Sequence, residues 1–399
     1  MKIDDKTSHN SPSIRFPEFT GEWKKCKLGI LATKVGSGST PKGGDAVYTS
    51  IGHYFVRSQN VGMGFLMLDN IAHINDDIHQ KHKATEIYEN DVLLNITGAS
   101  IGRTAVATKE LEGGNVNQHV CIIRTNSKVN PKFLCDYIQT QRIQNHIKSL
   151  QTGGSREGLN FEQIRSFPIS LPSINEQNKL TCLLDKINER IATQVRLIED
   201  LKKLRCAIVE KMFKQSKANG RLGDFIEQVS VRNKNGLYSN VLSVSNKQGF
   251  VKQSEQFEDR TVASEDTSNY KIVKRNNFAY NPARINVGSI ARLTKFDVGI
   301  VSPMYVCFRT KASIIPEYME AFFTSQQFFY EMMKRLEGSV RLCLSYEGLC
   351  NIPVYIPDMN KQIAMGQNIS LILSKIGLEI EYLGRLHQQK QYLLRKMFI

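Results

Sequence analysis

Two stretches of the chain place apolar residues at alternating spacings of three and four, which is the pattern of an amphipathic helix. The first runs from Leu180 to Met212 and the second from Met365 to Met397. Each would form a helix of about 40 residues, or roughly 60 Å at 1.5 Å per residue. The alternative, a helix packed only on its own domain, is disfavoured because a small domain has little surface for that length. We therefore predict two long helices that pair as a coiled coil.

Polar residues interrupt the apolar face of each predicted helix at two places. They are Gln194 and Arg205 in the first helix, and Glu379 and Lys390 in the second. If the helices are antiparallel, placing Arg205 opposite Glu379 also places Gln194 opposite Lys390. A buried polar layer of this kind fixes the register of a coiled coil. The residues expected to pair the helices are Gln194, Ile198, Leu201, Arg205, Glu379, Leu383, Leu386 and Lys390.

The chain also repeats itself at a distance of 185 residues. Residues 153–213 align with 338–398 without a gap, and the Lys-Met-Phe ending recurs in register. With one residue of slip, Val120-Cys121 aligns with Val306-Cys307. A repeat of this length indicates a tandem duplication, with halves of about 1–218 and 219–399.

Short apolar runs before each long helix, such as Val92–Thr97 and His119–Arg124, predict strands. Shorter helices are expected to begin at Pro131 and Pro316, because proline suits the first turn. The predicted fold class is α+β: two mixed α/β domains separated by two long antiparallel helices, in a pseudo-twofold internal duplication. The expected boundaries are 1–172 and 219–357 for the domains, and 173–218 and 358–399 for the helices.

Composition adds a preference for a polyanionic partner. The 399 residues include 53 Lys and Arg against 38 Asp and Glu, a net charge of +15 with a pI near 9.4. A content of 41% apolar residues is that of a folded protein. The polar N-terminus and the absence of long apolar runs predict a cytoplasmic protein, and eight cysteines without a C-x-x-C pair predict reduced, buried thiols.

Catalytic and ligand-binding motifs are missing from the sequence. Gly36–Thr40 has the glycines of a phosphate loop without the following Lys-Ser/Thr, and Asn281–Arg284 lacks the second proline and the aromatic residue of an adenine methylase motif. The spacing of His79 and His82 resembles that of metal ligands, but a solvated loop is favoured there. We expect no catalytic, cofactor or metal site, and a chain that binds and orients.

Several segments in a fixed order carry a resemblance to a known family. They are GSGSTPKGG (Gly36–Gly44), DVLLNITGASIGRTAVA (Asp91–Ala107) and SREGLNFEQIRSFPISLPSINEQNKL (Ser155–Leu180), the last matched in weaker form by Ser339–Ile363. Together they resemble the specificity subunits of type I restriction-modification systems. The resemblance covers nearly the whole chain.

The resemblance implies a non-catalytic subunit with two target recognition domains. Each domain would read one half of a bipartite, asymmetric site in double-stranded DNA, and the long helices would set the spacer. Two methyltransferase subunits would dock on the chain, and two restriction subunits, which are translocase-nucleases, would complete the complex. S-adenosylmethionine, ATP and magnesium would belong to those partners, which carry out adenine methylation and ATP-dependent restriction.

Candidate DNA-binding residues are polar and basic side chains in loops that flank the predicted strands, since such groups contact base edges and phosphates. For any one of them, the alternative is a solvated turn residue. The candidates in the first domain are Ser37, Ser39, Thr40, Lys42, Arg57, Gln59, Asn60, Thr97, Ser100, Arg103, Ser155 and Arg156. In the second domain they are Ser245, Asn246, Lys247, Tyr280, Asn281, Arg284, Asn286, Ser339 and Arg341.

Two other classes of function stay open at the level of the sequence. One is a degenerate DNA methyltransferase, which would bind S-adenosylmethionine as an isolated chain. The other is a stand-alone DNA-binding coiled-coil adaptor, which would not copurify with a methyltransferase.

Overall fold

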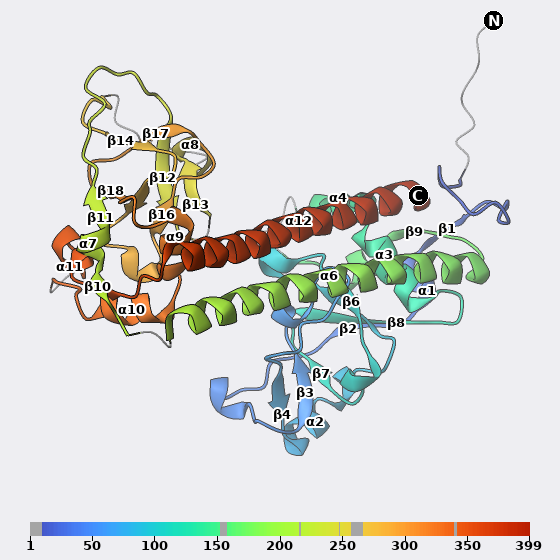
Figure 1. The fold of residues 1–399 in the computed structure, drawn as a ribbon. Coiled ribbons are helices and arrows are strands. Elements are labelled where there is room, and N and C mark those ends of the chain that lie inside the picture. Colours follow the sequence, from blue (N-terminus) through green and yellow to red (C-terminus); the bar gives the residue numbers. More distant parts are fainter. Residues whose placement is uncertain (1–9, 152–157, 215–216, 247, 257–265, 339–340) are drawn as a thin grey trace, which may run out of the picture. The chain divides into compact units, whose positions relative to one another are not determined.

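Figure 1 shows the computed structural model of the chain, which describes residues 10–151, 158–214, 217–246, 248–256, 266–338 and 341–399. The chain divides into two compact units, one of Met1–Thr193 with Tyr382–Ile399 and the other of Gln194–Glu381. Two long helices, α6 (Ile174–Lys214) and α12 (Met359–Met397), contribute residues to both units. The two long helices predicted from the apolar spacing are therefore confirmed.

The first unit is built on a four-stranded antiparallel sheet with the order β2-β8-β5-β6. A second sheet has the order β4-β3-β7, and β1 pairs with β9. The strands are β1 (Lys24–Lys27), β2 (Ala32–Ser37), β3 (His53–Val56), β4 (Ala72–Ile74), β5 (Val92–Asn95), β6 (Thr104–Val106), β7 (Asn115–Val116), β8 (Val120–Thr125) and β9 (Pro168–Leu171). The helices are α1 (Leu28–Leu31), α2 (Asp76–Lys81), α3 (Pro131–Gln139), α4 (Gln141–Gln151) and α5 (Phe161–Arg165).

The second unit repeats this plan with a four-stranded antiparallel sheet of order β11-β18-β15-β16. Its second sheet has the order β13-β12-β17-β14, and β10 pairs with β19. The strands are β10 (Gly220–Arg221), β11 (Ile226–Gln228), β12 (Val241–Ser245), β13 (Gly249–Lys252), β14 (Lys271–Lys274), β15 (Phe278–Tyr280), β16 (Ile290–Arg292), β17 (Val298–Val301), β18 (Val306–Thr310) and β19 (Pro353–Val354). The helices are α7 (Leu222–Phe225), α8 (Gln253–Gln256), α9 (Pro316–Phe322), α10 (Gln326–Met333) and α11 (Tyr346–Cys350).

Both long helices enter the hydrophobic core of each unit. In the first unit, Leu180 and Leu184 of α6 share a core with Leu394 and Met397 of α12. In the second, Val209 and Phe213 of α6 share a core with Ile369 of α12. The N-terminal part of α6 thus packs with the C-terminal part of α12, and the C-terminal part of α6 packs with the N-terminal part of α12. The helices are therefore antiparallel. The predicted α+β class with internal duplication is confirmed.

An Asn-x-Gln motif recurs in the repeat, as Asn175–Gln177 and Asn360–Gln362, and has a structural role in both halves. The side-chain oxygen of Gln177 accepts a hydrogen bond from the Asn130 backbone N–H at 2.8 Å, and its nitrogen donates to the Pro172 carbonyl at 3.0 Å. Gln362 makes the same two bonds, to the Ile315 N–H at 3.1 Å and to the Pro357 carbonyl at 3.0 Å. Both glutamines are buried. Each fastens the start of a long helix to the segment that precedes α3 or α9.

The predicted register of the long helices is wrong. The Gln194 side chain donates hydrogen bonds to the carboxylate of Glu379 and, at 3.1 Å, to its backbone carbonyl. Glu379 therefore faces Gln194, 11 residues before Arg205, and Gln194 does not pair with Lys390. Lys390 instead donates to the side-chain oxygen of Gln139 in α3 at 3.0 Å. The shorter helices supply partners that the apolar pattern of the long helices does not reveal.

Arg205 occupies the matching place in the second unit. It lines one hollow together with Glu320 of α9 and Ile369 of α12. Burial raises the pKa of Glu320, against the lowering effect of Arg292, which bonds it, and the smaller one of Arg205. Arg205 and Lys390 are equivalent in the repeat, and each lies beside a shorter helix of its own unit, α9 or α3.

All eight cysteines are free, as expected, but they are not uniformly buried. Cys121, Cys135 and Cys307 lie in the cores, whereas Cys182 and Cys206 of α6 are exposed. Among the described residues, no helix has the length and apolar character needed to cross a membrane.

Candidate nucleic-acid interface

Three loops of the first unit meet at one end of its four-stranded sheet. Because β2 and β5 both run antiparallel to β8, Ser37 at the end of β2 and Asn95 at the end of β5 lie beside the start of β8. The loops at this end are 38–43 after β2, 96–103 between β5 and β6, and 117–119 before β8. We call these three loops the first edge surface.

Polar side chains connect the loops of the first edge surface. The Thr40 hydroxyl donates to the side-chain oxygen of Gln118, whose nitrogen lies 3.3 Å from Nε2 of His119. The other ring nitrogen of His119 makes a short hydrogen bond with the Thr97 hydroxyl. A continuous line of side chains therefore crosses from the loop after β2 to the loop after β5.

Gly38 brings the loop after β2 against the turn before β8. Its N–H donates to the Asn117 carbonyl at 3.2 Å, and a Cβ atom at this position would lie 1.6 Å from the Val116 carbonyl oxygen. Only glycine allows this approach. The Gly-rich segment that resembles a phosphate loop is thus used for close backbone packing at the edge.

Seven of the sequence candidates of the first domain lie at or beside the first edge surface, and their side chains range from half-buried to exposed. They are Ser37, Ser39, Thr40, Lys42, Thr97, Ser100 and Arg103. Ser155 and Arg156 lie outside the described residues, although Gly158, just after them, forms a β-bridge with Thr97.

The remaining three candidates of the first domain follow β3. Since β3 is parallel to β7, Arg57 at the end of β3 lies near the turn that leads to β8. Its guanidinium lies over the Tyr48 ring at 5.4 Å, and its Nε is buried without a hydrogen-bond partner. Gln59 is exposed, but Asn60 is buried and holds the turn, accepting from the Arg57 N–H and donating to the Met67 carbonyl. Asn60 is therefore a structural residue.

The second unit has an equivalent edge. β11 and β15 both run antiparallel to β18, so their ends lie beside its start. The loops here are 281–289 between β15 and β16 and 302–305 before β18, which we call the second edge surface. Arg284 is exposed and Asn286 half-buried in the first of these loops. The Ser289 hydroxyl donates to the Val244 carbonyl at 3.1 Å, which joins this loop to β12, where Ser245 ends the strand and Asn246 follows it.

The assignment of Tyr280 to DNA binding is wrong. Its side chain is fully buried, and its hydroxyl donates to the Leu344 carbonyl at 3.2 Å. Burial raises the pKa of this hydroxyl. Asn281 is also buried, and its side-chain oxygen accepts from the Ala283 N–H at 3.1 Å, which shapes the loop. Both residues are therefore buried and hold the loops of the second edge surface in place.

Of the three other candidates of the second domain, the structure describes Arg341. Arg341 is exposed and precedes Leu344, whose N–H donates to the Pro282 carbonyl at 3.1 Å. Lys247 and Ser339 lie outside the described residues.

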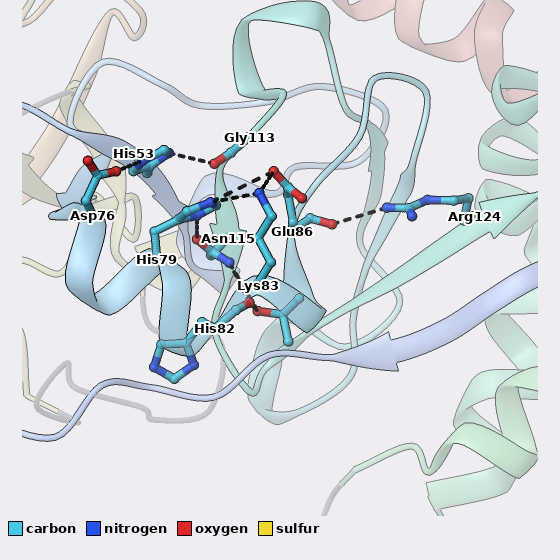
Figure 2. Close-up of polar contacts among 10 residues, drawn as sticks. His53, Asp76, His79, His82, Lys83, Glu86, Gly113, Asn115 and Arg124 are labelled. Carbon is cyan, nitrogen blue, oxygen red and sulfur yellow. Dashed lines mark hydrogen bonds and ion pairs between the residues drawn. The ribbon is translucent and has the colours of Figure 1, made fainter.

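The expectation of a solvated loop around His79 is also wrong. Asn75 caps α2 by accepting from the Ile78 N–H at 3.0 Å, and His79 on this helix is buried. Figure 2 shows its ring beside that of His53, with the ring centres 3.8 Å apart, while its Nδ1 bonds the Asn115 side chain at 2.7 Å. Among the described residues, no group of three His, Cys, Asp or Glu side chains could hold a metal.

The His79 cluster helps to position the first edge surface. Asn115, which bonds His79, donates to the His82 carbonyl at 2.9 Å, and Nδ1 of His82 lies 2.9 Å from the Ser39 hydroxyl. His53 is held by Asp76 at 2.7 Å and by the Gly113 carbonyl at 2.9 Å (Figure 2). The histidines therefore serve as packing and hydrogen-bonding groups behind the loop that contains Ser39.

Sequence reasoning missed Gln118, His119 and Met304, which lie in the turns before β8 and β18. Gln118 and Met304 are exposed there, and His119 is half-buried. Gln118 directly precedes the apolar run His119–Arg124, of which His119 is the first residue, and Met304 lies two residues before Val306. The aligned repeat was the available signal, because it shows that both halves carry a turn at this place.

Comparison with known proteins finds similar sequences and structures. Residues 20–203 match the family model described as the type I restriction modification DNA specificity domain. The type I restriction enzyme EcoBI specificity subunit of Escherichia coli is 24% identical over 135 residues, which cover 33% of this chain and 28% of that protein. The matched segment therefore spans less than a third of that relative.

Two solved structures are similar over nearly their whole length. The S subunit of a type I restriction-modification system from M. genitalium has a TM-score of 0.59 at 17% identity, with 98% of this chain and 99% of that chain covered. A chain from a structure that describes complex assembly and conformational transition of the type I R-M system has a TM-score of 0.56 at 15% identity, covering 94% and 97%. The resemblance seen in the sequence is thereby confirmed: residues 20–203 match the type I restriction modification DNA specificity domain, and the fold of the chain is similar to that of the solved S subunit.

Proposed function

We propose that the chain is the DNA-reading subunit of a type I restriction-modification complex, with each edge surface contacting one half of a bipartite, asymmetric site. One observation carries the proposal. Each unit has its own four-stranded sheet, and in both units loops from equivalent strands meet at the equivalent end of that sheet. The loops at that end carry different side chains in the two units, as unlike half-sites require. The net charge of +15 favours a polyanionic partner.

The long helices have two roles in this proposal. Two readers on one face of B-DNA are separated by about one helical turn, roughly 34 Å, and paired helices hold such a distance better than a flexible linker. The helices also dock two methyltransferase subunits, and two restriction subunits complete the complex in the cytoplasm. Adenine methylation and ATP-dependent restriction, with S-adenosylmethionine, ATP and magnesium, belong to those partners.

Arg103 and Arg284 test the proposed surfaces, because each is exposed in an edge loop of its own unit. Replacing either with alanine in the chain with its methyltransferase partner is expected to weaken binding to target DNA about tenfold, through loss of a base or phosphate contact. Affinity is measured by fluorescence anisotropy at several salt concentrations, with thermal unfolding to verify the fold.

Arg142→Ala is the matched control, since Arg142 is exposed on α4 and outside the edge loops. It should leave affinity unchanged. Unchanged affinity in both Arg103→Ala and Arg284→Ala would reject the edge surfaces as the DNA interface.

A further inference from the structure

The turn before β8 and the turn before β18 occupy the same place in the two halves, but their exposed side chains differ in chemistry. Counted back from the aligned Val120 and Val306, Gln118 corresponds to Met304. We infer that this single position reads a base in each half-site, through hydrogen bonds from Gln118 in one and through apolar contact from Met304 in the other. The inference rests on the proposed function.

The backbone around Gln118 is firmly held. The Asn117 carbonyl accepts from the N–H groups of Gly38 at 3.2 Å and Val120 at 3.3 Å, and the Asn117 side-chain oxygen accepts from the His119 N–H at 3.1 Å. Asn117 itself is buried. A side chain that reads a base must be presented in a fixed position, and this turn meets that condition.

The amide of Gln118 is oriented by its neighbours and keeps capacity for a ligand. Its oxygen accepts from the Thr40 hydroxyl, and its nitrogen lies 3.3 Å from the His119 ring. An amide oxygen has two lone pairs and an amide nitrogen two hydrogens, so one acceptor and one donor position remain beside each other. That pair matches the N6 amino group and N7 of adenine in the major groove.

Met304 also lies on a turn with a fixed backbone, but its side chain cannot form the hydrogen bonds that an amide forms. Its side chain is 56% exposed and lies outside the two hydrophobic clusters that the described residues of its unit form. The next residue, Tyr305, is buried and anchors the turn: its hydroxyl accepts from the Val244 N–H at 3.4 Å and its carbonyl from Lys271 at 2.6 Å.

Met304 thus leaves more than half of its surface exposed on a fixed turn, outside the hydrophobic clusters of the described residues. In the major groove, the thymine methyl group is the apolar feature that such a side chain can contact. The two halves would thus read different bases from the same place in the fold.

The test uses the full chain expressed with its methyltransferase partner, and maps methylated adenines in DNA from cells that carry Gln118→Ala or Met304→Ala. Gln118→Ala is expected to relax one A·T base pair of one half-site, lowering discrimination there by about tenfold to a hundredfold. Met304→Ala is expected to relax one base pair of the other half-site, by a smaller factor.

Matched controls replace exposed residues of the same types outside the edge loops, Gln141→Ala on α4 and Met333→Ala on α10. Both should keep the parent pattern, and thermal unfolding verifies the fold of all four variants. If Gln118→Ala and Met304→Ala leave both half-sites unchanged, or each relaxes both, the inference is overturned. Failure of the proposed function would look different, since the parent chain would then direct methylation to no bipartite site.

Discussion

Asp136 is the most unusual ionisable side chain of the first unit. It lies on α3, buried beside Lys390 of α12, and Gln139 bonds both residues. Burial raises the pKa of its carboxyl to about 7, against the lowering effect of the Lys390 charge. The carboxyl is therefore close to half-protonated at neutral pH, in a place where the long helix meets the domain.

Asp136→Asn should make unfolding less dependent on pH. The pKa of Asp136 lies above the value of about 3.9 in an unfolded chain, so the wild-type protein loses stability as pH rises from about 4 to 7. The variant carries no such group. Its free energy of unfolding, relative to that of the wild type, should therefore rise by about 1 kcal/mol or more between pH 5 and pH 8. Urea unfolding at the two pH values measures the difference.

Asp69→Asn is the control, because Asp69 is exposed in the same unit. It should show no such gain. An Asp136→Asn difference that is equal at pH 5 and pH 8 would contradict the assignment.

The sequence located the edge loops, but it did not distinguish the residues proposed to contact DNA from those that hold the loops in place. Tyr280 and Asn60 have the polar groups of DNA contacts, yet both point inward and hold the chain. Within a strand, the alternation of apolar and polar residues indicates which side chains point into the core. This pattern ends with the strand, so it gives no such information for the loops. Met304 was missed for a related reason, since an apolar residue beside a strand resembles core.

At the scale of elements, the long helices were predictable and their register was not. The spacing of Leu180, Leu184 and Ile187 alone indicates a helix with one apolar face. The four polar residues in the two apolar faces allow more than one pairing, and Lys390 bonds Gln139 of α3 and not Gln194. Gln194 faces Glu379, its own counterpart in the repeat, as expected at the centre of two equivalent antiparallel helices.

Gln194→Leu should destabilise the helix pair by removing a donor to the Glu379 carboxylate. Hydrogen bonds from Lys375 and Gln194 lower the pKa of Glu379, so their stabilisation is present above the unfolded pKa of about 4.3 and is lost as pH falls through the folded value. The melting temperature at pH 7 should drop by a few degrees.

The double variant Gln194→Leu/Glu379→Leu replaces the polar layer with an apolar one. It should recover or exceed the wild-type melting temperature, since a well-packed apolar pair avoids burying a carboxylate. A double variant no more stable than Gln194→Leu would show that the pair does not act as a unit.

For the whole molecule, the duplication would let one chain address an asymmetric site, as the proposed function requires. The two halves share sheet order, the Asn-x-Gln fastening and the long helix, so each half supplies the same scaffold. They differ where the edge loops are exposed, as at Gln118 and Met304. Under the proposed function, the shared scaffold would set the spacer and the unlike loops would read the sequence.

Lengthening both long helices by seven residues tests that separation. The facing of Gln194 and Glu379 places Leu201 opposite Ile372, so insertions after Asp200 and after Ile372 keep the register. Seven residues add roughly 10 Å, or about three base pairs. We expect a longer spacer between unchanged half-sites. Mapping of methylated adenines measures both. Altered half-sites with the original spacer would show that the helices do not set it.

The most direct measurement of the central claim is a map of methylated adenines in DNA from cells that contain the methyltransferase partner with or without this chain. We expect one bipartite, asymmetric sequence, methylated only when the chain is present, with one half-site altered by Arg103→Ala and the other by Arg284→Ala. Methylation of the same sites without the chain, or of a single undivided sequence with it, would show that the chain does not read a bipartite site.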